Sequence, residues 1–134
     1  YHNGRLNRGL LSSRVFGKSD KIVLLNSIVH PVVRFDFYRW SESLNEEICF
    51  VESAILYESR FDELVDEVWT VTAPEELRIG RVRQRSGLTE EEIKKRMAAQ
   101  LSEEEKQRRA AHIIWNDGNV SVIHRVLSLL KSLE

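Results

Sequence analysis

The stretch VWTVTAPEELRIGRVRQRSGLTEEE, residues 68–92, decides the fold class of this chain. It begins with a short apolar run rich in β-branched residues, which is typical of a buried strand. The spacing of Thr72 and Glu75, with Pro74 between them, predicts a capping box, and Gly87 is placed to end the helix that follows. A strand that leads directly into a helix is the unit of a parallel sheet, so the stretch predicts an α/β fold.

The same alternation continues on both sides of this stretch. Short apolar runs at 48–51 and 113–115 predict two further strands. Gly17 and Pro31 are expected to separate three N-terminal helices, which we place at 8–17, 18–29 and 32–44. We therefore expect four segments in chain order: a helical region at 1–47, core strands and their connection at 48–73, an arginine-bearing helix and lid at 74–109, and a last core strand with a C-terminal helix at 110–134.

Some side chains in these elements are expected to be buried. The C-terminal helix carries an apolar stripe at helical spacing, which predicts packing against the core: Val120, Ile123, Leu127 and Leu130. Trp69 and Trp115 lie in predicted strands and are expected to be core residues as well. Cys49 also falls in a predicted strand, where a small buried side chain is a better interpretation than a nucleophile.

Composition excludes several classes of function. The 134 residues carry a formal net charge of −1, so general attraction to nucleic acid or to an acidic membrane is not expected. No apolar run is long enough to span a bilayer. With one cysteine there is no intrachain disulfide, which favours a reducing, cytoplasmic setting. His112 and His124 have no partner at metal-ligand spacing, and we expect no metal-ligating residue in this chain.

The arginines of the deciding stretch are the main candidates for chemistry. On a helix, Arg78, Arg81 and Arg85 share one side, whereas Arg83 points elsewhere. One interpretation is a solvated basic face near a helix C-terminus, where the macrodipole favours cations. The other is a lid that closes arginines over phosphates, because planar guanidinium groups bind phosphate oxygens in pairs.

Five segments, in this order, resemble dephospho-coenzyme A kinases: NGRLNR (3–8), HPVVR (30–34), VESAILYES (51–59), the lid block VWTVTAPEELRIGRVRQRSGLTEEEIKKRMAAQ (68–100) and AAHIIWNDG (110–118). The resemblance implies a P-loop kinase fold with a parallel sheet, a helical substrate region and a helical lid. It also implies transfer of the γ-phosphoryl group of ATP, with Mg²⁺, to the ribose 3′-hydroxyl of dephospho-coenzyme A.

The resemblance further implies roles for particular residues. Arg81 and Arg85 correspond to lid arginines that meet the ATP phosphates, and Asn116 falls near the adenine. On the acceptor side the corresponding residues are His30, Arg34, Leu56 and Glu58. Each has a plainer interpretation: a helix end before proline for His30, a solvated helix position for Arg34, a local pair for Glu58 and a turn for Asn116.

The chain also departs from the family. Ala54 stands where the family has proline, and Trp115 where it usually has aspartate. No Gly-x-x-x-x-Gly-Lys-Ser/Thr motif occurs, and FGKSD (16–20) only ends like one. We therefore expect the first two strands, the P-loop and the catalytic aspartate to be missing. On this interpretation the chain is a truncated form, inactive alone, whose exposed sheet edges allow self-association.

Two alternatives remain open. The protein could be another P-loop kinase of metabolites or nucleotides with the same lid. It could also be a non-catalytic binding fragment.

Overall fold

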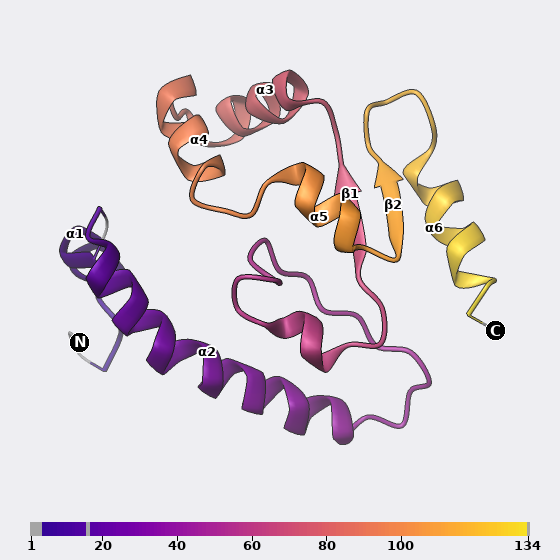
Figure 1. Cartoon of the computed structure of the whole chain (residues 1–134), viewed down its shortest axis with the longest axis horizontal. Helices are drawn as coiled ribbons and strands as arrows, with labels where there is room; N and C mark the ends of the chain where they lie inside the picture. The colour runs from indigo at the N-terminus through magenta and orange to yellow at the C-terminus, as the bar shows by residue number, and fades with distance from the viewer. Residues whose placement is uncertain (1–3, 16, 134) are drawn as a thin grey trace. The chain divides into compact units, whose positions relative to one another are not determined.

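The computed structural model describes residues 4–15 and 17–133. The chain divides into two compact units, one ending at Val51 and the other beginning at Glu52, and each is described by itself (Figure 1). Within the described residues, no helix has both the length and the apolar character needed to cross a membrane.

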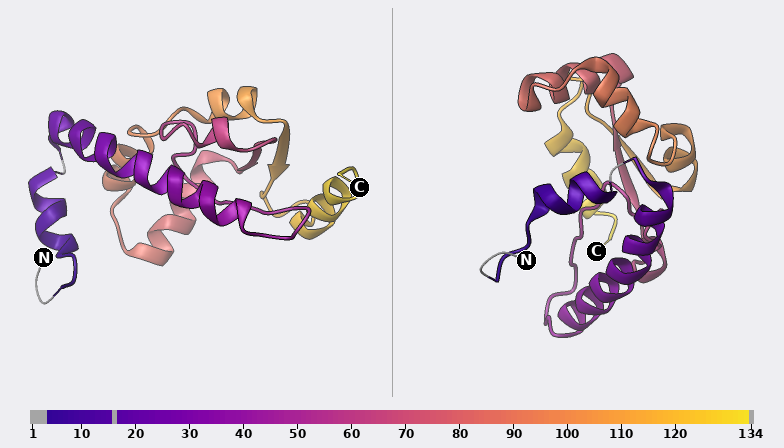
Figure 2. Two further views of the ribbon diagram at one scale, coloured as in Figure 1. Left: turned by 90° about the horizontal axis from the view of Figure 1, so that it is seen from below. Right: turned by 90° about the vertical axis from the view of Figure 1, so that its left-hand side faces the viewer.

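Two helices form the first unit. They are α1 (Arg8–Val15) and α2 (Ser19–Glu42), and Gly17 lies between them with a φ of 75°. The expected helix at 8–17 includes Phe16, which lies outside the described residues. The expected break at Pro31 is wrong, because α2 continues through it as one helix (Figure 2). A proline inside a helix forfeits one backbone hydrogen bond and crowds the preceding turn, but a long helix keeps its bonds on both sides.

A two-stranded parallel sheet is the centre of the second unit. Strand β1 (Trp69–Thr72) pairs with β2 (His112–Trp115), with Trp69 opposite His112 and Thr72 opposite Trp115. The connection between them contains α3 (Glu75–Ser86), α4 (Glu90–Met97) and α5 (Glu103–Arg109). Helix α5 packs on β1, and α6 (Val122–Leu130) packs on β2 (Figure 1). The predicted α/β class with a parallel sheet is thereby confirmed.

Before β1, the second unit has turns and a short 3₁₀ helix, η1 (Phe61–Leu64). The buried apolar side chains of the unit come from this segment, from the end of β1 and from α3, α4 and β2: Tyr57, Phe61, Ala73, Ile79, Ile93 and Ile114. The core is therefore shared by the segment before β1, the strands, and helices α3 and α4.

Residues 48–51 do not form the predicted strand. They have no regular secondary structure, and in the described part of the chain the strand ladder joins only β1 and β2. An apolar run becomes a strand only where a neighbour pairs with its backbone groups. Cys49 is consequently exposed, and its predicted burial is wrong.

The predicted burial of the C-terminal apolar stripe is also wrong for all of its residues except Leu130, which is half-buried. Val120, Ile123 and Leu127 are exposed, as is Trp115 at the end of β2. Helical spacing shows which side chains share a face, but burial needs a surface broad enough to cover them. Among the described elements α6 packs on β2, and this contact leaves Ile123 and Leu127 uncovered.

The helix ends agree with the sequence at two of the predicted boundaries and differ at a third. Thr89 and Glu92 form the complete capping box at the start of α4, and Gly87 ends α3 with a φ of 67°. In contrast, the N-cap of α3 is Pro74, and Thr72 does not cap it. Thr72 is the last residue of β1, and its hydroxyl bonds to side chains of α5.

Candidate active site

The ends of the two strands define the candidate site. Thr72 and Trp115 end β1 and β2 side by side, and the N–H of Asn116 donates to the carbonyl of Thr72 over 2.8 Å. Ligands of open parallel sheets bind beyond the carboxyl ends of the strands. Asn116 therefore stands at the edge where this fold places its ligands.

Arg81 reaches this edge from α3. Its Nη1 donates to the backbone carbonyl of Asn116 over 2.8 Å, and its Nη2 lies 3.5 Å from Oδ1 of the same residue. The structure thus brings together two residues that the sequence analysis singled out separately. A guanidinium has five N–H donors, so three remain for a ligand. Arg81 is exposed and can present them.

Arg85 lies one turn further along α3. It is exposed, and no ion pair joins it to another described residue. Gly87 turns the chain directly after α3, and α4 packs against α3 beyond it. Arg81 and Arg85 therefore share one side of α3. Arg81 is held by its bond to Asn116, whereas the last turn, which carries Arg85, faces solvent.

Arg78 has a different environment from the other arginines of α3. Its Nη1 lies 2.9 Å from Oε1 of Glu103, and both side chains are largely covered. The other oxygen, Oε2 of Glu103, accepts from the Thr72 hydroxyl over 3.0 Å. Sequence analysis missed Glu103, because its two partners touch it in space but lie 25 and 31 positions away along the chain. No local pattern signals such a pair.

A tight turn follows Asn116. Oδ1 of Asp117 accepts from the N–H of Asn119 over 2.9 Å, and Oδ2 accepts from its side-chain amide over 3.0 Å. The bond from the backbone of Asn119 lowers the pKa of Asp117, and the charge of Arg81 adds a smaller effect in the same direction. Asp117 is therefore ionised near neutral pH and contributes negative charge beside Arg81.

Glu58 and Leu56 belong to the turn segment before η1. Oε1 of Glu58 accepts from the N–H of Leu101 over 2.6 Å and so ties this segment to the chain after α4. Leu56 is half-buried. Nearby, Arg109 lies 4.1 Å above the ring of Tyr57 and pairs with Asp62 at 2.6 Å. The bond to Leu101 fixes the position of the Glu58 side chain. Its second carboxylate oxygen, Oε2, can still accept a hydrogen bond from a ligand.

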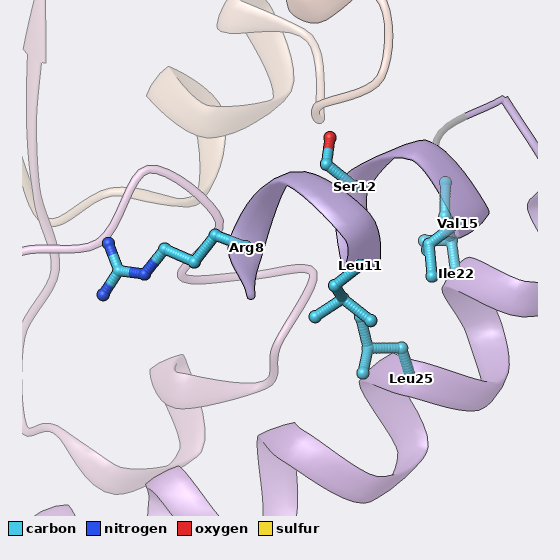
Figure 3. Close-up of a pocket in the computed structure, with 6 residues that line it drawn as sticks. All are labelled: Arg8, Leu11, Ser12, Val15, Ile22 and Leu25. Atoms are coloured by element: carbon cyan, nitrogen blue, oxygen red, sulfur yellow. The ribbon is translucent and has the colours of Figure 1, made fainter. Parts of the chain in front are cut away.

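His30 and Arg34 lie on α2 in the first unit. Their spacing of four places them on one side of that helix, and both are half-buried. The first unit also has an apolar pocket of about 220 Å³ between α1 and α2, lined by Arg8, Leu11, Ser12, Val15, Ile22 and Leu25. In Figure 3 the four apolar side chains gather on one side, and the guanidinium of Arg8 extends away from them. None of the predicted site residues lines this pocket.

The described residues do not gather the ligands of a metal. Among them there is no group of three or more His, Cys, Asp or Glu side chains close enough to hold an ion. Mg²⁺ is usually held by one or two carboxylates together with the phosphates of its substrate. The described residues therefore do not show which side chains would hold Mg²⁺.

Comparison with known proteins fits this arrangement. The family model described as dephospho-CoA kinase matches residues 1–121. This chain belongs to the dephospho-CoA kinase family. A dephospho-CoA kinase of Bacteroides fragilis is 39% identical over 134 residues, covering 99% of this chain and 65% of that protein. A dephospho-CoA kinase of Porphyromonas gingivalis is 33% identical, and the match covers 99% of this chain and 66% of that protein. The chain therefore spans about two thirds of the length of these dephospho-CoA kinases.

Solved structures agree with the family assignment. The structure of TT1252 from Thermus thermophilus matches with a TM-score of 0.85 and 34% identity, over 97% of this chain and 68% of that one. A dephospho-CoA kinase from Campylobacter jejuni matches with a TM-score of 0.67 and 25% identity. The match covers 100% of this chain and 70% of that one. The resemblance recognised in the sequence is thus confirmed at the level of the family.

Proposed function

We propose that the protein containing this chain transfers the γ-phosphoryl group of ATP to the ribose 3′-hydroxyl of dephospho-coenzyme A, the last step in the synthesis of coenzyme A. The observation that carries this proposal is the bond from Arg81 to Asn116. It holds a cation of the arginine helix at the carboxyl edge of the sheet in a chain of the dephospho-CoA kinase family.

In this proposal the arginines stabilise the charge of the transferred group. Negative charge spreads over the phosphoryl oxygens during transfer, and positioned cations neutralise it. Arg81 offers its unused N–H groups from a fixed position, and Arg85 approaches from the exposed last turn of α3. Asn116 would lie beside the adenine, with its backbone already fixed by Thr72 and Arg81.

We propose acceptor-binding roles for His30 and Arg34 on α2 of the first unit and, separately, for Leu56 and Glu58 of the second unit. Arg34 and His30 can bind phosphate or hydroxyl oxygens, and Leu56 can contact apolar parts of the acceptor. Glu58 has one oxygen bound to Leu101, so its role would use the other. Mg²⁺, when bound with ATP, would supply further positive charge at the phosphates.

We also propose that these 134 residues do not turn over substrate alone. The support is the lack of a Gly-x-x-x-x-Gly-Lys-Ser/Thr sequence to cradle the triphosphate. The single cysteine, Cys49, agrees with a cytoplasmic setting for the reaction.

We further propose that the chain can associate with itself. The two strands each pair on one side only within the described residues, so a second copy could pair with a free edge. A sedimentation coefficient that is independent of concentration would argue against self-association.

A substrate panel tests the proposed reaction. ATP and Mg²⁺ are supplied with dephospho-coenzyme A, with nucleoside monophosphates, or with small sugars, and the phosphorylated product is identified by mass. The protein that contains this chain should phosphorylate dephospho-coenzyme A and leave the other acceptors largely unchanged. Preference for a nucleoside monophosphate or a sugar would replace the proposal with another metabolite kinase, and lack of ATP binding would favour a non-catalytic fragment.

A further inference from the structure

Two arginines of α3 connect this helix to the ends of both strands. Arg78 and Arg81 are three residues apart and so lie on the same side of the helix. Arg81 bonds directly to Asn116, which follows β2. Arg78 pairs with Glu103, and the second oxygen of Glu103 accepts from Thr72, which ends β1. The position of α3 over the sheet edge therefore depends on two separate connections.

Glu103 is held firmly in its own position. Its side chain is 22% exposed, and Thr72 at its Oε2 is 3% exposed. Nε2 of Gln107 donates to the same Thr72 hydroxyl over 3.2 Å. Nζ of Lys106 lies 3.9 Å from Oε1 of Glu103 and 3.1 Å from Oε1 of Gln100. The Thr72 hydroxyl and the Lys106 ammonium therefore hold the Glu103 carboxylate at the start of α5, next to the end of β1.

Arg78 depends on this carboxylate. Its side chain is 27% exposed, and its Nε is buried with no hydrogen-bond partner among the described residues. A cation that is largely removed from water is stable only when it is paired, and removal of the partner leaves its charge uncompensated. Without the charge of Glu103, Arg78 would turn toward solvent. The first half of α3 would then lose its connection to β1.

We propose that Glu103 is a positioning residue for the phosphate-binding arginine of this site. Its pair with Arg78 sets the place of α3, and thereby the place of Arg81 one turn later. Glu103 itself does not contact the nucleotide. The proposal rests on the proposed function in one respect, the assignment of Arg81 to the phosphates of ATP.

The test compares three variants of the protein that contains this chain: Glu103→Gln, Arg81→Ala and the double variant. Glu103→Gln keeps the shape of the side chain and removes its charge. The matched control is Glu105→Gln on the same helix, because the carboxylate of Glu105 pairs with the exposed Arg108 of its own helix. Dissociation constants for Mg·ATP are measured by calorimetry, and the side-chain amide of Asn116 is followed by NMR in each free protein.

We expect Glu103→Gln to weaken ATP binding about tenfold, the lower end of what one hydrogen bond to a charged group contributes. In the Arg81→Ala background the same change should have an effect of less than about twofold, because the residue acts through Arg81. The Asn116 amide signal should shift in Glu103→Gln and stay in place in Glu105→Gln. A purely structural role would lower the melting temperature without this dependence on Arg81.

Two results would overturn the proposal: effects of Glu103→Gln and Arg81→Ala that simply add, or an Asn116 signal unmoved in a folded Glu103→Gln protein. If the wild-type protein does not bind ATP, the proposed function fails, whereas the Asn116 signal still decides whether Glu103 positions Arg81. Should Glu103→Gln not fold, Arg78→Lys replaces it. This variant keeps the positive charge but loses the planar guanidinium group with its paired N–H donors. It should also shift the NMR signal of the Asn116 side-chain amide.

Discussion

Nη1 of Arg81 donates a 2.8 Å hydrogen bond to the backbone carbonyl of Asn116, the first residue after β2. The two residues are 35 positions apart in the chain. The acceptor is a main-chain atom, so the bond fixes the guanidinium relative to the sheet itself. Arg81 is thereby oriented before any ligand arrives, and an oriented donor loses less entropy when it binds.

Arg85→Ala separates binding from stability. Arg85 is exposed and has no ion pair with a described residue, so its loss should leave the melting temperature unchanged. Loss of its bonds to phosphate should weaken ATP binding by roughly tenfold or more. Calorimetric titration with Mg·ATP measures the change, and Arg83→Ala on another side of α3 is the control. If Arg85→Ala and Arg83→Ala bind Mg·ATP with equal affinity, Arg85 does not belong to the ATP site.

Thr89→Ala tests the cap of α4. The hydroxyl of Thr89 accepts from the N–H of Glu92 over 3.3 Å, and such a cap contributes about 0.5–2 kcal/mol. We expect a loss of this size in the free energy of unfolding, together with faster amide exchange in the first turn of α4. Ser128→Ala removes a hydroxyl that does not cap a helix and is the control. Unchanged exchange in α4 would contradict the observed capping box.

The same cap predicts a dependence on pH. The N–H of Thr89 donates to Glu92, which lowers the pKa of Glu92 from its ordinary 4.5, and the Thr89 hydroxyl adds to the effect. Because the pKa is lower in the folded state, the stabilisation is complete above pH 4.5 and is lost as the pH falls through the folded value.

Unfolding of the wild type and of Glu92→Gln measures this dependence at about pH 6.5 and about pH 3. The wild type should be more stable than the variant at the higher pH, and the difference should shrink at the lower one. A difference that grows with acidification would show that the bonds to Glu92 do not lower its pKa.

Two isoleucines test which apolar side chains form the core. Ile114 is 2% exposed in β2, and Ile123 is 71% exposed on α6. Ile114→Val should lower the free energy of unfolding by about 0.5–1.5 kcal/mol, and Ile123→Val should change it by less than about 0.5 kcal/mol. Chemical denaturation of the two variants measures both values. A larger loss for Ile123→Val would mean that the face of α6 is covered in solution.

Local chemistry explains what the sequence predicted correctly. The two strands of the sheet, the end of α3 at Gly87 and the capping box of Thr89 depend on residues within a few positions of each other. Arg81 and Arg85 were found on one side of α3 for the same reason. Their phosphate-binding roles remain predictions.

The features that the sequence did not predict depend on distant partners. The run at 48–51 has the composition of a strand but joins no strand ladder among the described residues, and the described residues leave most of the C-terminal apolar stripe exposed. The bond between Arg81 and Asn116 and the pair of Arg78 with Glu103 join residues far apart in the chain. The role of a residue such as Glu103 therefore becomes visible only in three dimensions.

The most direct test of the central claim is the turnover of Arg81→Ala with Mg·ATP and dephospho-coenzyme A in the protein that contains this chain. Circular dichroism confirms the fold, and Arg83→Ala is assayed in parallel. The account predicts that Arg81→Ala lowers turnover by roughly 10³ or more, as for other arginines that stabilise phosphoryl transfer, with little change for Arg83→Ala. A loss of less than about tenfold in a folded Arg81→Ala protein would contradict the assignment of Arg81 to the transferred phosphate.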